Sequence, residues 1–195
     1  MKPGNWQQGV SLLEVMVVLA MIGVVASLAF PDFRNFMNQQ RIHHYTASLH
    51  GALNFSRFEA MRRGAYVTIC RSENAESGNP VCASSNSNPL SNTGWASGWI
   101  IFVDKNNNGL YDGAGQQRDE LLRVQGPLIS QASDGSIVPA PQRKFITFNP
   151  TGQTFGSFMR FAINRPDNDK NVANERFICL ASGGRVRVSR EICVN

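Results

Sequence analysis

Two arginines near the C-terminal end, Arg185 and Arg187, have the side chains and the spacing of an anion-binding site. They follow Ser182-Gly183-Gly184, a composition typical of a tight turn, and alternate with two valines that would face the core. Residues two apart on a strand project from one face, here roughly 7 Å apart, and paired guanidinium groups bind phosphate without reading base sequence. The segment, with Arg190 nearby, predicts either a DNA-binding strand or an ordinary solvated strand face. Four other basic residues could widen such a patch: Arg143, Lys144, Arg160 and Arg176.

A polar loop, residues 104–112, resembles the first part of a calcium-binding loop. Its alternate oxygen-bearing side chains suit Ca²⁺, but Gly115 stands where the bidentate glutamate should be. Asn and Gly also form turns readily, so a polar hairpin turn is the competing interpretation, and we predict no metal centre. The ligands of the calcium interpretation would be Asp104, Asn106, Asn108 and Asp112, with Asp119 or Glu120 as the substitute for the missing glutamate.

The other reactive side chains form no catalytic pattern. His43, His44 and His50 lie close together in the sequence, and His43 and His50 could share a helix face, but no third metal ligand is evident. No Cys/His or Ser/His/Asp arrangement suited to nucleophilic catalysis stands out. We therefore expect a protein that is not an enzyme and that needs no cofactor.

An apolar run of 21 residues, 10–30, contains a single charged residue, Glu14. As a helix it would be about 31 Å long, close to the thickness of a bilayer core. The preceding segment is short and carries Lys2, which favours a cytoplasmic N-terminus and places the remainder on the other side of the membrane. An ordinary signal peptide cleaved after Ser27-Leu28-Ala29 is the alternative. Glu14 argues against it, because a carboxylate in an apolar helix is costly and therefore a functional candidate.

The four cysteines all lie beyond the apolar run. An even number in an exported domain predicts two disulfides, but the sequence leaves their connectivity open. We expect pairing of sequence neighbours, Cys70 with Cys82 and Cys179 with Cys193, over the alternative of free buried thiols. The second bridge would close a loop around the arginine segment.

Hydrophobic periodicity indicates the elements that hold these residues. Apolar residues recur at three-to-four spacing up to residue 63, which predicts a helix with one buried face, ended by Gly64. That face comprises Ile42, Tyr45, Leu49, Ala52, Leu53 and Ala60. Beyond it, β-branched and aromatic runs separated by turn residues predict one antiparallel sheet packed on the helix. The predicted strands are residues 66–70, 99–103, 120–124, 145–148, 158–163, 177–181 and 185–189.

The segment Gly9-Val10-Ser11-Leu12-Leu13-Glu14 resembles the processing site of type IV prepilins. That resemblance implies cleavage after Gly9 by a prepilin peptidase and N-methylation of Val10, where the family often has phenylalanine. It also implies that Glu14 pairs with a neighbouring subunit in the filament and that Pro31 kinks the helix. The implied divisions are a leader, 1–9, a transmembrane segment, 10–30, an amphipathic continuation of the helix, 31–63, and a periplasmic domain, 64–195.

Three later motifs resemble the FimT/FimU minor pilins and the H-type pseudopilins (GspH) of type II secretion. They are residues 97–109, the turn Phe148-Asn149-Pro150-Thr151-Gly152, and Gly184-Arg185-Val186-Arg187, which matches the G-R-x-R element of DNA-binding FimT-type pilins. The resemblance implies an α+β pilin fold, an inner-membrane location before assembly, and other pilin subunits as partners.

Two functions remain open at this point. In the first, a minor pilin of a type IV pilus captures double-stranded DNA during natural transformation. In the second, a structural subunit primes or caps a pilus or a type II secretion pseudopilus. The net charge of +5 is compatible with an acidic partner but is too modest to decide between them.

Overall fold

The computed structural model describes residues 9–84, 93–116, 118–129, 134–156, 158–164 and 175–193, and for residues 28–35 the backbone alone. The chain divides into two compact units, residues 1–40 and 41–195. The described part of the first unit is almost entirely helical, and the second contains the end of the same helix and all the described strands. The candidate DNA-binding residues all belong to the second unit.

The helix α1 (Leu12–Arg63) has a specific signal at each end. Ser11 caps its start, because the Ser11 hydroxyl accepts the backbone N–H of Glu14 at 3.2 Å. At its end, Gly64 has a positive φ of 62°, and the Ala65 N–H donates to the carbonyl of Ala60 at 3.2 Å. This is the Schellman arrangement, and it accounts for the end of the helix where the sequence predicts it.

The first unit exposes the apolar side chains of α1, with Leu12 78% and Val25 67% exposed. Within the described part of the chain, no helix combines the length and the apolar character needed to cross a membrane. The α-helix continues through position 31, but the side chain of Pro31 lies outside the described residues. The expected kink and the expected segment boundary there stay predictions.

Within the described residues, eight strands form two antiparallel sheets, which we call sheet A and sheet B. Sheet A contains β1 (Val67–Arg71), β2 (Trp99–Val103), β3 (Glu120–Gln125) and β5 (Phe145–Phe148), in the order β3-β2-β1-β5. Sheet B contains β4 (Ser136–Ala140), β6 (Met159–Asn164), β7 (Arg176–Leu180) and β8 (Val186–Ser189), in the order β4-β6-β7-β8. A short 3-10 helix, η1 (Trp95–Ser97), precedes β2.

The seven predicted strands are present, each within one residue of its predicted ends. The prediction of a single sheet is wrong, because alternation along a strand does not specify which strand it pairs with. Strand β4, which contains Pro139, was not among the predicted strands. Proline removes a ladder hydrogen bond, and β4 tolerates it because β4 is one of the two edge strands of sheet B.

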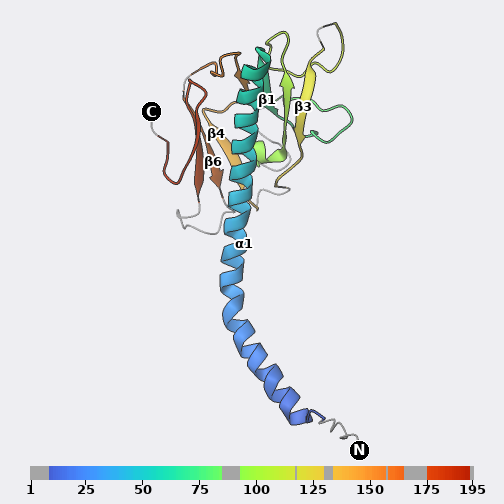
Figure 1. Cartoon of the computed structure of the whole chain (residues 1–195), viewed down its shortest axis with the longest axis vertical. Coiled ribbons are helices and arrows are strands. Elements are labelled where there is room, and N and C mark those ends of the chain that lie inside the picture. The colour runs from blue at the N-terminus through green and yellow to red at the C-terminus, as the bar shows by residue number, and fades with distance from the viewer. Residues whose placement is uncertain are drawn as a thin grey trace, which may run out of the picture. The chain divides into compact units, whose positions relative to one another are not determined.

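One hydrophobic core joins the C-terminal part of α1 to both sheets. Leu49 and Leu53 of the helix, Ile101 of β2 and Phe161 of β6 are all fully buried in this cluster. Figure 1 shows this part of α1 crossing both sheets, with β1 and β3 to one side and β4 and β6 to the other. All six residues of the predicted helix face are buried, which confirms that prediction.

Candidate functional site

The turn between β7 and β8 holds the arginine segment in place. The Gly184 N–H donates to the Ala181 carbonyl at 2.8 Å, and the Ala181 N–H donates to the Arg185 carbonyl at 3.0 Å. Gly184 has a φ of 76°, and a Cβ at this position would lie 1.8 Å from the carbonyl oxygen of Gly152. Only glycine fits at position 184. The motif that ends at Gly152 and the motif that begins at Gly184 therefore pack directly against each other.

Arg185 and Arg187 are exposed, and strand pairing places Arg187 opposite Cys179. Residues directly opposite in an antiparallel pair share one face, and Cys179 in turn pairs with Arg160 of β6. Arg187, Cys179 and Arg160 therefore form a row across the outer face of sheet B, with the two arginines about 10 Å apart at the backbone. Arg185 precedes β8, and its backbone hydrogen bond with Ala181 continues the pairing, so the two-residue spacing puts Arg185 on the same face. We call Arg160, Arg185 and Arg187 the arginine face.

The valines that alternate with these arginines differ in burial. Val186 packs against the main core, as the sequence predicts. Val188 is 46% exposed, so the expectation that it faces the core is wrong. It pairs with Ile178 and thus lies on the inner side, but β8 is the other edge strand of sheet B, where fewer atoms cover the inner face.

Both disulfides are present in the locally paired form. Cys179–Cys193 links β7 to the C-terminal segment with a Cα–Cα distance of 5.9 Å, and Phe177 packs with it in a small cluster. Because Cys179 lies on the outer face of sheet B, the bridge holds Cys193 on this face. Cys70–Cys82 instead fixes the loop after β1, at a Cα–Cα distance of 5.6 Å.

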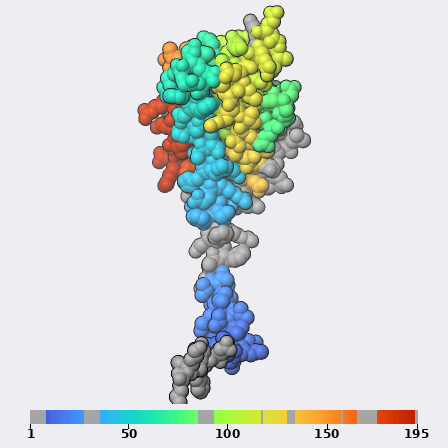
Figure 2. Space-filling model, turned by 45° about the vertical axis from the view of Figure 1, so that its right-hand side comes forward, coloured from blue at the N-terminus to red at the C-terminus, as the bar shows by residue number. Residues whose placement is uncertain are grey.

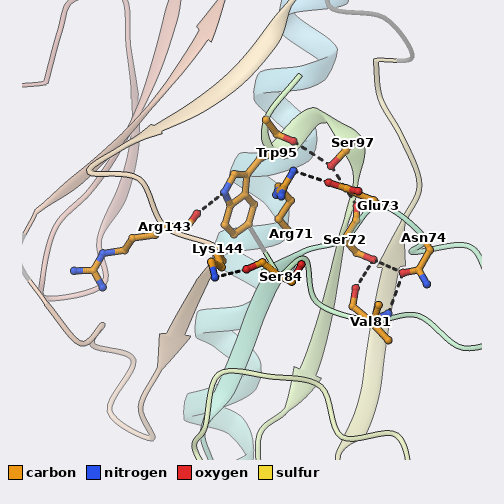
Figure 3. A network of polar contacts seen from close by, with 11 residues as sticks. Arg71, Ser72, Glu73, Asn74, Val81, Ser84, Trp95, Ser97, Arg143 and Lys144 are labelled. Atoms are coloured by element: carbon orange, nitrogen blue, oxygen red, sulfur yellow. Dashed lines mark hydrogen bonds and ion pairs between the residues drawn. The ribbon is translucent and has the colours of Figure 1, made fainter. Parts of the chain in front are cut away.

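The other basic residues are distributed unevenly around this face. Arg190 is exposed. The pKa of Arg176 is lowered mainly by burial and, to a smaller extent, by the nearby positive charge of Arg190. Lys144 donates to the Ser84 carbonyl, and the Arg143 carbonyl accepts the Trp95 indole N–H at 2.9 Å. Figure 3 shows Lys144 turned toward Ser84 and the Arg143 guanidinium pointing away from this network. Lys144 therefore does not extend the arginine face.

The loop with calcium-ligand spacing satisfies its own polar groups. Asp104 is buried and accepts the backbone N–H groups of Asn108 at 3.2 Å and Gly109 at 2.9 Å. Asn106 and Asn108 turn their amide nitrogens, which are donors, toward one oxygen of Asp112 at 2.8 and 2.9 Å. This geometry is that of a polar turn. Within the described ranges, no group of three or more His, Cys, Asp or Glu side chains could hold a metal ion.

The N-terminal residues of the predicted processing site lie just before α1. Gly9 and Val10 are exposed and have no regular structure, and Val10 is 69% exposed. Glu14 is in the first turn, where its charge suits the helix dipole. Among the described residues of this chain, its carboxylate has no ion-pair partner.

Two arginine-containing features near the end of α1 were not predicted. Glu59 is bound by both Arg62 and Arg63, at 2.8 and 2.7 Å, a pattern that the i, i+3 and i, i+4 spacing could have indicated. Arg57 lies beside the two close-packed glycines, Gly152 and Gly184. No sequence signal reveals that arrangement, because it joins three segments far apart in the chain.

Comparisons with known proteins agree with the fold. Residues 46–190 match the family model described as type II transport protein GspH, and residues 7–30 match the prokaryotic N-terminal methylation motif. A crystal structure of the type IV minor pilin FimU from Pseudomonas aeruginosa superposes with a TM-score of 0.54 at 17% identity, covering 79% of this chain and 92% of that one. A second crystal form of FimU gives a TM-score of 0.45 at 16% identity, covering 77% and 91%. No curated protein sequence matches the chain.

Proposed function

The chain belongs to the GspH family of type II transport proteins, and we propose that it is a minor pilin whose outer arginine face binds double-stranded DNA without sequence preference. The observation that carries the proposal is the shared face of Arg185, Arg187 and Arg160. Within the described residues, none of these three side chains has an ion-pair or hydrogen-bond partner. Phosphate groups would supply the missing acceptors.

Assembly is the other part of the proposal. The match to the N-terminal methylation motif supports cleavage after Gly9 by a prepilin peptidase, with Val10 as the methylated first residue. We infer that residues 10–30 anchor the subunit in the inner membrane with the β-rich domain in the periplasm. In the filament, the Glu14 carboxylate would pair with the terminal amine of a neighbouring pilin subunit, since two opposite charges in a low dielectric attract strongly.

DNA binding is tested by titrating a labelled duplex with the full-length protein in detergent at several salt concentrations. We expect a dissociation constant in roughly the micromolar to 100 micromolar range at physiological salt. Replacing Arg185 and Arg187 together by Gln should weaken binding equally for unrelated sequences and reduce the log–log salt slope by about 0.9 for each phosphate that the variant no longer neutralises. Arg160→Gln should have a smaller effect of the same kind.

The matched control is Arg118→Gln, an exposed arginine on the loop before β3, which should bind DNA as the parent does. Circular dichroism should show the same fold for all variants. A double variant that binds like the parent at matched salt would place any DNA site elsewhere.

The match to a type II transport family favours a second candidate function. In it, the protein is a structural subunit that primes or caps a pilus or a type II secretion pseudopilus and contacts only other subunits. Absence of DNA binding by the parent even at low salt, together with its recovery in sheared filaments, would establish this function in place of the first.

A further inference from the structure

Strand β5 is the one edge strand of the two described sheets that has neither a charged residue nor a proline. Each of the other three edge strands has such a residue: Glu120 in β3, Pro139 in β4 and Arg187 in β8. Charges and prolines on an edge strand hinder pairing with another chain. The composition of β5, Phe-Ile-Thr-Phe, instead favours strand pairing.

Strand β5 directs alternate backbone groups away from its partner β1. The Arg71 N–H donates to the Lys144 carbonyl at 2.8 Å, which makes these residues a hydrogen-bonded pair of the ladder. Such pairs alternate along an antiparallel ladder, so Ile146 also faces β1, whereas the N–H and C=O groups of Phe145 and Thr147 point away from it. Within the described residues, the backbone N–H and C=O of Phe145 have no hydrogen-bond partner.

A groove of about 240 Å³, which we call the β5 groove, lies along this free edge. It is lined by Phe145 and Thr147 from sheet A, by Met159 and Leu180 from sheet B, and by Phe155 from the segment between β5 and β6. Figure 2 shows the turn that follows β5, coloured orange, at the surface beside the end of α1, coloured teal. The turn that leads to the groove is therefore accessible to another molecule.

The size and the aromatic lining of the β5 groove indicate what kind of occupant fits. Phe145 is 38% exposed and Phe155 is 56% exposed, so two large rings contact water here. Pockets for small molecules are usually larger, roughly 300–1,000 Å³, and the groove suits about one or two side chains of a protein segment. Exposed aromatic residues beside an arginine are typical of protein interfaces.

Arg143 adds a positive charge to the lining of this groove. Within the described residues its guanidinium makes one hydrogen bond, a long one of 3.5 Å to the Phe155 carbonyl at an exposed position, although the group has five N–H donors. Figure 3 shows this guanidinium pointing away from the network around Trp95. No acidic side chain is among the described residues that line the groove. The groove is therefore complementary to a carboxylate from another molecule.

We propose that the β5 groove receives an extended segment of a neighbouring pilin subunit, which adds a strand to β5 and pairs an acidic side chain with Arg143. This inference rests on the proposed assembly into a filament. The free edge at Phe145 needs a backbone partner, which a peptide supplies by strand addition. An apolar side chain of the same segment would cover Phe145 and Phe155. A DNA phosphate would also bind Arg143, but it would leave both rings in contact with water.

The first test is amide hydrogen exchange of the full-length protein, in detergent and in purified filaments. In detergent the Phe145 amide should exchange at least about tenfold faster than the Ile146 amide, because the Ile146 N–H is bonded to β1. In filaments the Phe145 amide should slow by about tenfold or more, because the added strand accepts its hydrogen bond. Ile146 is the internal control, and the measurement needs no substitution.

The second test reverses the charge of Arg143. Incorporation of Arg143→Glu into sheared filaments should fall by about tenfold or more, and that of Arg143→Gln by less. Both variants should melt at the temperature of the parent in detergent, since the side chain loses only one long, exposed hydrogen bond. Arg118→Glu, on an exposed loop, is the matched control and should be incorporated normally.

The third test identifies the segment with a photo-crosslinking phenylalanine analogue at position 155 in cells that assemble filaments. We expect a cross-link to an acid-containing segment of another pilin subunit. Changing the acidic residue of that segment to arginine should restore the incorporation of Arg143→Glu.

Three results would overturn the inference. They are normal incorporation of Arg143→Glu, equally fast exchange of the Phe145 amide in detergent and in filaments, and weaker DNA binding by Arg143→Gln with unchanged incorporation, which would identify a phosphate as the partner of Arg143. Failure of the parent itself to enter filaments would overturn the proposed assembly together with this inference.

Discussion

Glu59 shows how single residues at the end of α1 are fixed by charge. Its carboxylate is nearly buried and accepts hydrogen bonds from Arg62 and Arg63. Arg63 also reaches Glu120 of β3 at 2.8 Å and so ties the helix to the edge of sheet A. These arginine hydrogen bonds lower the pKa of Glu59 from 4.5 to about 2.

The lowered pKa predicts how stability depends on pH. Because the folded state binds the Glu59 proton more weakly than the unfolded state, the ion pairs stabilise the fold above about pH 4.5, and the effect is lost as the pH falls toward 2. Urea unfolding of the parent and Glu59→Gln should therefore show a stability difference near neutral pH that shrinks across this interval. A difference that stays constant down to pH 2 would contradict this assignment. Glu120→Gln is the control, and should give a smaller effect because Glu120 is 55% exposed.

At the scale of elements, the β7–β8 hairpin depends on one backbone position. Gly184→Ala would place a methyl group against the Gly152 carbonyl and force a left-handed conformation on alanine. We expect a loss of stability of more than about 1 kcal/mol, and weaker DNA binding because the turn that positions Arg185 shifts. Thermal unfolding and the DNA titration measure both effects.

Gly183→Ala provides a matched control in the same turn. A Cβ at Gly183 would meet no atom within 4 Å, and Gly183 does not have a positive φ. Equal stability of the two variants would show that the close approach of Gly152 and Gly184 is not needed for the hairpin.

Local periodicity explains how much of these elements the sequence predicts. The buried face of α1 and seven strands follow from spacing alone, since each depends on residues a few positions apart. Pairing depends on tertiary contacts, so the split into two sheets and the approach of Arg160 to Arg187 across Cys179 were not predictable. The position of Arg57 was not predictable for the same reason, because its neighbours Gly152 and Gly184 are about a hundred residues away or more in the sequence.

At the scale of the whole molecule, the two compact units suggest separate tasks. The second unit carries the arginine face. The first presents exposed apolar side chains and a carboxylate, Glu14, that has no ion-pair partner within the described residues. After the proposed cleavage at Gly9, the new amine at Val10 would be four residues from Glu14 and available to a neighbouring subunit.

This division predicts that Glu14→Ala separates membrane insertion from assembly. Removing a charge makes the segment more apolar, so membrane extraction should recover as much variant as parent. Incorporation into sheared filaments should fall strongly, because the terminal amine of the neighbouring subunit loses its counter-charge in a low-dielectric environment. Glu14→Asp, which keeps the charge, should be less impaired. Mass spectrometry should find Val10 as the methylated first residue in parent and variants alike, which excludes a processing defect. Normal incorporation of Glu14→Ala would disprove the pairing, and a first residue at Phe30 would show that the segment is an ordinary signal peptide.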